Sequence, residues 1–200
     1  MILQPVLMPV PSAQLRRGPE RLAVQRRVSR LALAECARRC GLAHRDWPKD
    51  AGDVPQPSGG YHWSISHKPT WAAAVIADQP VGIDLEQIKP RHPHLFDGVG
   101  EGLEWALLGE QNWDNFFRLW TAKEATCKAN GVGIGGMGHC RLIEIRDADH
   151  VVMSYKGRPW LVEHFRHLDH LAAVTVVAAT IRWQVVDRPG GDDRSGRVGG

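Results

Sequence analysis

The chain has 200 residues, of which 43% are hydrophobic and 24% are charged, and its formal net charge is +3. This composition is that of a soluble globular protein with one or two domains, and the charge is too small to indicate nucleic-acid binding by itself. No apolar run approaches the roughly 20 residues of a membrane span, so we expect a cytoplasmic protein with no membrane or nucleic-acid partner.

The first part of the chain predicts one long helix followed by strands. Arg16 to Cys40 is rich in Ala, Leu and Arg, and Gly41 follows as a C-terminal stop. The segment from Ala43 to Gly60 is rich in Pro, Gly and Asp and predicts a loop. Three strand candidates follow, and their order suggests an antiparallel meander: His62–Ser66, Trp71–Ala77 and Val81–Leu85.

The second part repeats the order of helix and strands without repeating the residues. Gln87 to Gly102 is irregular, and Trp113 to Asn130 predicts a second helix with Asp114 as its N-terminal cap. Three more strands are expected at Leu142–Ile145, Trp160–Val162 and Val174–Trp183. We therefore expect an α+β protein with halves 1–81 and 82–187, and a disordered tail over 188–200.

Two carboxylates are predicted on one side of the strand that contains Gly82-Ile83-Asp84-Leu85-Glu86. Side chains two apart in a strand point the same way, so Asp84 and Glu86 share a face while Ile83 and Leu85 face the core. Carboxylate oxygens suit Mg²⁺, but a solvated polar strand face is the better interpretation of this short pattern alone.

The helix over Trp113 to Asn130 carries Glu124 and Lys128 one turn apart, hence on one face. Taken alone, this pair fits an ordinary surface ion pair. Lys123 points about 100° away from Glu124 in a regular helix and would need a long reach to share its ligand. Ser64-Ile65-Ser66-His67 ends a predicted strand with groups that can bind a phosphate or simply form a polar turn.

The three motifs in this order resemble the 4′-phosphopantetheinyl transferase superfamily, closest to its surfactin-type, single-chain branch. The resemblance runs from about Arg21 to Gly133 and is strong over Tyr61 to Glu86 and over Phe117 to Lys128. It implies two similar α+β halves, each a helix on an antiparallel sheet, related by a pseudo-twofold. It also implies transfer of 4′-phosphopantetheine from coenzyme A to a serine of an acyl or peptidyl carrier protein, with release of 3′,5′-ADP.

The resemblance assigns roles to individual residues. Asp84, Glu86 and Glu124 would bind Mg²⁺, with Mn²⁺ as an alternative, and Glu124 would accept the serine proton directly or through water. Further residues would bind coenzyme A: Lys123 and Lys128 at the diphosphate, Ser66 and His67 at the 3′-phosphate, and Arg27 and Lys49 as additional cations. The family's Gly-Lys/Arg-Pro loop is altered here, because Gly52-Asp53-Val54-Pro55 has no cation and Lys49 has to substitute.

Two other functions compete with this interpretation. The same carboxylates could serve a metal-dependent nucleotide phosphohydrolase, and the arginine-rich first helix could serve an RNA-binding domain. The carrier type is not specified by the sequence, and we expect a monomer from the resemblance to the family.

Overall fold

The structure is a computed structural model that describes residues 2–11, 18–42, 45–178 and 180–186. The predicted disordered tail from Arg188 lies outside the described residues. None of the described helices has the length and apolar character that crossing a membrane requires.

The first sheet has four strands in the order β2-β3-β1-β9 and carries helix α1 (Pro19–Arg39) on one face. Its strands are β1 (Val6–Pro9), β2 (His62–His67), β3 (Trp71–Ala77) and β9 (Gln184–Val185). Strand β3 pairs with β2 and β1 in antiparallel fashion, whereas β1 and β9 run parallel. This sheet is therefore mixed, unlike the purely antiparallel sheet that we predicted.

The second sheet has five antiparallel strands in the order β4-β8-β7-β6-β5 and packs on helix α4 (Trp113–Ala129). Its strands are β4 (Ile83–Gln87), β5 (Cys140–Ile145), β6 (His150–Tyr155), β7 (Arg158–His167) and β8 (His170–Thr175). Between β4 and β5 lie the short helices α2 (Leu95–Val99) and α3 (Gly102–Leu108), then α4, and the 3-10 helix η2 (Ile134–His139).

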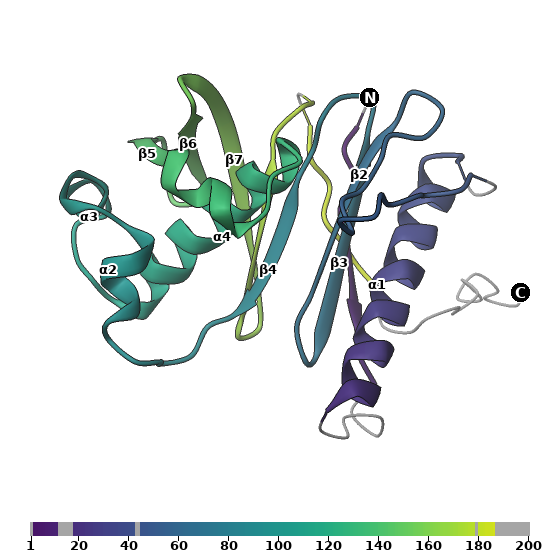
Figure 1. The fold of residues 1–200 in the computed structure, drawn as a ribbon, viewed down its shortest axis with the longest axis horizontal. Coiled ribbons are helices and arrows are strands. Elements are labelled where there is room, and N and C mark those ends of the chain that lie inside the picture. Colours follow the sequence, from purple (N-terminus) through teal and green to yellow (C-terminus); the bar gives the residue numbers. More distant parts are fainter. Residues whose placement is uncertain (1, 12–17, 43–44, 179, 187–200) are drawn as a thin grey trace, which may run out of the picture.

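The two sheets lie between the two long helices, with α1 on one outer side and α4 on the other (Figure 1). The alternation of side chains along each strand produces this layering. Ala72, Ala74 and Ile76 of β3 belong to the core beneath α1, whereas Ala73, Val75 and Ala77 join the core between the sheets.

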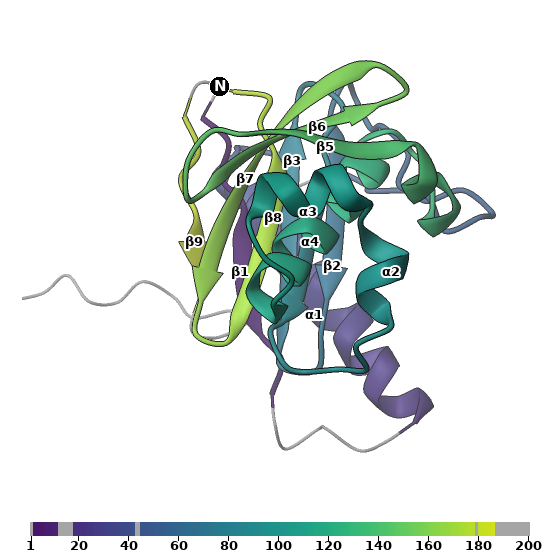
Figure 2. The same cartoon turned by 90° about the vertical axis from the view of Figure 1, so that its left-hand side faces the viewer.

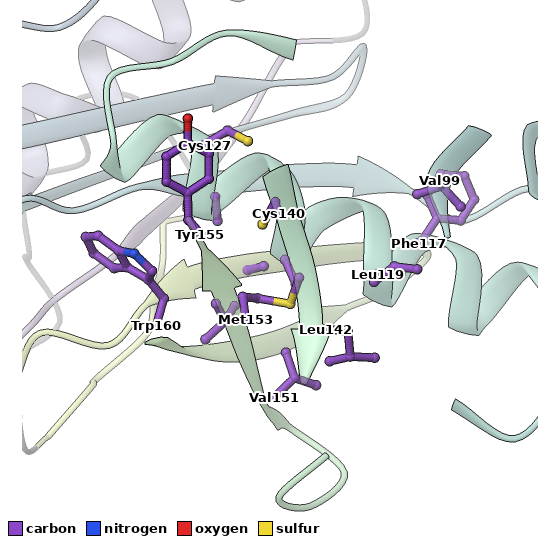
Figure 3. Packing of buried hydrophobic residues seen from close by; sticks show 14 of the residues in the cluster. Val99, Phe117, Leu119, Cys127, Cys140, Leu142, Val151, Met153, Tyr155 and Trp160 are labelled. Carbon is purple, nitrogen blue, oxygen red and sulfur yellow. The ribbon is translucent and has the colours of Figure 1, made fainter. Parts of the chain in front are cut away.

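The core beneath α4 is rich in aromatic and sulfur-containing side chains. Phe117 and Cys127 of α4 lie in it with Cys140 and Met153 of the second sheet (Figure 3). Turned by 90°, the molecule shows α2, α3 and α4 together over this sheet (Figure 2). The four cysteines are free thiols.

The α+β class is confirmed, but several sequence predictions are wrong in detail. The third strand does not complete a meander, because β4 leaves the first sheet and pairs with β8. The strand expected over Val174–Trp183 ends at Thr175. Helix α4 is capped by Asn112, whose side chain accepts a hydrogen bond from the Asn115 amide at 2.8 Å, so the cap precedes Asp114 by two residues.

The chain changes sheets between Ala77 and Ile83, where we placed the boundary between the halves, but β9 returns to the first sheet. The division into halves and their pseudo-twofold relation remain predictions.

Candidate active site

A cavity of about 640 Å³ opens where the edge strands of the two sheets, β2 and β4, approach helix α4. Its lining includes seven of the predicted site residues, namely Lys49, Ser66, His67, Asp84, Glu86, Glu124 and Lys128. Residues from α1, the loop before β2, and the segment after α4 complete the lining. The fold thus brings together predicted site residues that are up to 79 positions apart (Lys49 to Lys128) in the sequence.

Gly82 allows β4 and α4 to lie this close. A Cβ atom at Gly82 would stand 1.9 Å from the carbonyl oxygen of Ala125 and 2.6 Å from the amide nitrogen of Ala129. Both contacts are with helix backbone, which cannot rotate away as a side chain can. The glycine before the two acidic residues therefore sets the distance at which α4 faces Asp84.

Asp84 is buried, and only one of its carboxylate oxygens has bonding partners. Its Oδ1 atom accepts hydrogen bonds from Ser66 Oγ at 2.9 Å and from Lys128 Nζ at 2.7 Å. Its Oδ2 atom is buried and has no hydrogen-bond partner among the described residues. A buried carboxylate oxygen without a partner is costly, and such an atom is available to a ligand.

Glu86 lies on the same side of β4 and is held by two cations. Its Oε1 atom stands 2.6 Å from Lys68 Nζ, and its Oε2 atom stands 3.4 Å from an Arg91 guanidinium nitrogen. Burial, and then the nearby charge of Asp84, raise the pKa of Glu86 despite these cations. As predicted, Ile83 and Leu85 face the apolar core between the sheets.

Glu124 faces the same cavity from α4. Its Oε1 atom is buried and, like Asp84 Oδ2, lacks a hydrogen-bond partner within the part of the chain that the structure describes. Burial raises the pKa of Glu124, and the charge of Asp84 raises it further. The sequence-distant carboxylates therefore meet in one cavity, where the charge of Asp84 disfavours the ionised forms of Glu86 and Glu124.

The donor set fits a hard divalent cation, because carboxylate oxygens are its preferred ligands and two of them are buried without partners. Asp84, Glu86 and Glu124 are the residues that could hold such an ion. In the present arrangement lysines partly neutralise them, and the described residues contain no group of three or more His, Cys, Asp or Glu side chains already placed to hold a metal. Binding would therefore require the carboxylates to turn away from these lysines.

The positive groups of the cavity lie on both sides of the carboxylates. Lys128 Nζ bonds Asp84 and also donates to the Ile83 carbonyl oxygen at 3.0 Å. Lys49 also lines the cavity and pairs with Asp53 at 2.9 Å. Burial, and then the Lys68 charge, lower the pKa of His67, so at neutral pH it offers a neutral imidazole to a ligand.

Two predicted residues lie outside this cavity. Lys123 is 3% exposed, and its Nζ atom lies 2.8 Å from Glu104 Oε1 and 2.9 Å from Glu104 Oε2 on the other side of α4. This corrects the prediction that Lys123 contacts the diphosphate, and the helical rotation of 100° from Glu124 is the reason. Arg27 is exposed and does not line the cavity.

Sequence reasoning missed the cations that the structure does place in the cavity wall, namely Arg26, Arg30 and Lys68. Arg30 is fixed by its stacking on the Trp63 ring at 4.7 Å and by a 2.8 Å hydrogen bond to the Trp47 carbonyl oxygen. Lys68 directly follows Ser66-His67, and that position was the signal that could have identified it. The phase of helix α1, which decides between Arg26, Arg27 and Arg30, could not be read from its weak apolar pattern.

Comparison with known proteins shows which family the chain matches. Residues 80–179 match the family model described as the 4′-phosphopantetheinyl transferase superfamily, which is half of the chain. The chain is 36% identical over 78 residues to a 4′-phosphopantetheinyl transferase of Bacillus pumilus (psf-1), which covers 37% of this chain and 34% of that protein.

Two further relatives are similar to the same extent. The 4′-phosphopantetheinyl transferase Sfp of Bacillus subtilis is 31% identical over 77 residues, or 36% of this chain and 34% of its own length. The 4′-phosphopantetheinyl transferase gsp of Aneurinibacillus migulanus is 36% identical over 77 residues, or 36% of this chain and 32% of its own. The matched part of this chain thus spans about a third of the length of each relative.

Proposed function

Because this chain belongs to the 4′-phosphopantetheinyl transferase superfamily, we propose that it transfers 4′-phosphopantetheine from coenzyme A to a serine of an acyl or peptidyl carrier protein, releasing 3′,5′-ADP. One observation carries this proposal. The buried Asp84 and Glu86, the half-buried Glu124 and several cations converge on a cavity between two sheets, and two carboxylate oxygens there have no partner among the described residues. A cavity of about 640 Å³ also lies within the usual range for a ligand of this size.

The diphosphate of coenzyme A requires positive charge on both sides. Lys128 lies beside Asp84 and is 27% exposed, so its ammonium can turn toward a phosphate oxygen. Ser66 and His67 at the end of β2 offer a hydroxyl and a neutral imidazole, and Arg26, Arg30 and Lys49 extend the positive wall toward α1. These residues would hold the nucleotide phosphates while the phosphopantetheine end reaches the carrier.

We propose that Asp84, Glu86 and Glu124 hold Mg²⁺, with Mn²⁺ as a substitute. When bound, such an ion neutralises charge that develops on the diphosphate during transfer. The partnerless Asp84 Oδ2 and Glu124 Oε1 atoms are the ligand atoms that this donor set offers first.

The serine hydroxyl must lose a proton as its oxygen attacks the β-phosphorus. Glu124 is the residue proposed to accept that proton, directly or through a water molecule. In the protein without a bound ion, burial and then the charge of Asp84 raise the pKa of Glu124, which favours a proton on this carboxylate. The reaction then balances with the proton on Glu124, a new serine–phosphorus bond, and 3′,5′-ADP as the leaving group. Given these substrates, we also propose that the protein works as a monomer in the cytoplasm.

The test is a transfer assay across several apo carriers. Purified protein is incubated with coenzyme A, MgCl₂ and apo carriers of fatty-acid, polyketide and nonribosomal-peptide systems, and intact mass is measured. A gain of one phosphopantetheine on any carrier supports the proposal. No gain on any carrier, with phosphate released from nucleotides instead, would contradict it and support hydrolysis.

Asp84→Ala tests the site itself. We expect it to reduce the transfer rate by at least about a hundredfold, because it removes a proposed metal ligand and the Lys128 partner together. Asp97→Ala is the matched control, since it makes the same change at an exposed residue of α2. Circular dichroism spectra of both variants should show a folded protein. Near-normal transfer by Asp84→Ala would refute the metal assignment.

A further inference from the structure

Lys68 places an ammonium group directly on a proposed metal ligand. Its Nζ atom lies 2.6 Å from Glu86 Oε1, the shortest of the contacts between cations and carboxylates in this cavity. Lys68 follows the end of β2, and its backbone amide donates to the Trp71 carbonyl oxygen at 2.7 Å, which closes the turn into β3. The side chain therefore reaches from a fixed point in the first sheet to β4 of the second.

The two lysines that pair with the carboxylates of β4 are held differently. Lys128 is bonded to Asp84 and also to the Ile83 carbonyl oxygen, so its ammonium is tied to the β4 backbone. The structure gives Lys68 Nζ a contact with Glu86 alone among the groups it describes, and the side chain is 28% exposed. The Lys68 ammonium can therefore swing into solvent at a smaller cost than that of Lys128.

We propose that Lys68 is a built-in counter-ion of the candidate metal site, which neutralises Glu86 in the absence of a divalent cation and competes with that cation for the Glu86 carboxylate. The inference rests on the proposed function only for the identity of the three carboxylate ligands. A divalent cation that binds Glu86 Oε1 is repelled by the ammonium group on the same oxygen, and this repulsion favours displacement of the ammonium. Lys68 therefore lowers the affinity of the protein for the metal.

A second consequence concerns the cavity after displacement. The released ammonium stays near Ser66 and His67, because Lys68 is the next residue along the same chain segment. It then adds one positive charge beside the residues proposed to bind phosphate. The Lys68 side chain thus neutralises part of the carboxylate cluster when no metal is bound. Once metal is bound, it supplies positive charge for an anionic ligand.

The experiment measures Mn²⁺ binding directly, without coenzyme A or a carrier protein. Free Mn²⁺ is quantified by electron paramagnetic resonance during titration of wild type and Lys68→Met. We expect Lys68→Met to bind Mn²⁺ about three- to tenfold more tightly, as for the loss of one partly exposed competing ion pair. Lys68→Arg, which keeps the charge, should bind Mn²⁺ within about twofold of wild type.

Lys89→Met is the matched control, because it removes the same charge from an exposed lysine that does not line the cavity. It should change Mn²⁺ affinity much less than Lys68→Met does. An equal change in the two variants would show that only net charge matters and would overturn the inference. A Lys68→Met protein that melts at a lower temperature with unchanged Mn²⁺ affinity would assign Lys68 a purely structural role and would also overturn it.

Asp84→Asn separates this inference from the proposed function. Suppose that the wild type binds Mn²⁺, that Asp84→Asn does not bind it, and that the wild type modifies no carrier. The transferase proposal then fails while the result for Lys68 stands. If carriers are modified but Lys68→Met leaves the Mn²⁺ affinity unchanged, only the Lys68 inference fails. If neither wild type nor Lys68→Met binds Mn²⁺ at millimolar concentration, Lys68 controls no metal affinity and the inference is overturned.

Discussion

The two sides of helix α4 carry similar charged groups, which are enclosed in a buried ion pair on one side and face a cavity on the other. On one side, Lys123 meets Glu104, and both side chains are 3% exposed. On the other side, Glu124 and Lys128 face the cavity with Asp84. The residues at positions 123 and 124 are neighbours in sequence, yet one belongs to a closed ion pair and the other to an open site.

The hydrogen bonds explain the difference. Both Glu104 oxygens contact Lys123 Nζ, and each also accepts a backbone amide, from Leu142 at 2.8 Å and from Glu101 at 3.0 Å. Every strong acceptor of that carboxylate is satisfied, as a buried charge requires. Asp84 and Glu124 each retain a buried oxygen with no partner among the residues that the structure places. A saturated carboxylate indicates a structural role, and an unsaturated one indicates a place for a ligand.

The largest effect on stability is expected when the buried ion pair between Lys123 and Glu104 is broken. Lys123→Met leaves the buried Glu104 without its cation, so we expect the free energy of unfolding to fall by about 3–5 kcal/mol. Denaturant unfolding with a two-state fit measures this change. Coenzyme A affinity of the folded fraction should stay within about twofold of wild type, since Lys123 is outside the cavity.

The double variant Lys123→Met/Glu104→Gln tests whether the loss comes from the unpaired charge. It should be more stable than the sum of its single variants predicts, because the two residues are in contact. A Lys123→Met protein with native stability and weak coenzyme A binding would reverse the comparison. That result would restore the phosphate-binding role that the family resemblance implied.

The sequence predicted best those features that depend on local periodicity. Helix α4 was expected over Trp113 to Asn130 and is observed over Trp113–Ala129, and the shared face of Asp84 and Glu86 follows from alternation along a strand. Strand β1 escaped notice because it has four residues and ends at a proline. Strand pairing was also inaccessible, since β4 pairs with β8 across more than 80 residues.

Site residues could be predicted only where a sequence motif, or the regular spacing of side chains along a helix or strand, indicated them. Rotation along the helix already placed Lys123 away from Glu124, and the structure places it in a buried ion pair outside the cavity. Glu104 and Lys68 could not be assigned partners from sequence, because both ion pairs join elements that only tertiary folding brings together: α3 with α4, and the β2–β3 turn with β4.

The next largest effect is expected for Lys128→Ala, which should change the affinity of the cavity for coenzyme A. Removing an ammonium that can bond a phosphate oxygen should weaken coenzyme A binding about ten- to hundredfold, as for the loss of one charge-assisted hydrogen bond. Isothermal titration calorimetry with coenzyme A measures the change, and Lys89→Ala is the control for net charge. Affinity for an apo carrier should change much less, and an equal loss for both ligands would contradict the phosphate role of Lys128.

The smallest effect is a gain in stability at the open side. Burial, and then Asp84, raise the pKa of Glu124, so the folded protein holds a proton there more tightly than the unfolded chain does. Stability from this group is therefore present at low pH and is lost as the pH rises from about 4.5 through the raised pKa. Glu124→Gln keeps the shape and removes the charge. Without added metal, it should gain about 1 kcal/mol, or about 2–4 °C in melting temperature, at pH 8.

The gain in stability from Glu124→Gln should shrink toward zero near pH 4.5. There the raised pKa favours a neutral wild-type carboxyl group, which then resembles the neutral amide of the variant. Melting curves of both proteins at pH 4.5 and pH 8 give the difference. Glu124→Gln should also lose most carrier modification, because its amide cannot accept the serine proton. A variant that is less stable than wild type at pH 8 would mean that the Glu124 charge is well compensated, and the contrast between the two sides of α4 would no longer hold. Stability gained where activity is lost is the behaviour expected of a carboxylate kept unsaturated for a ligand.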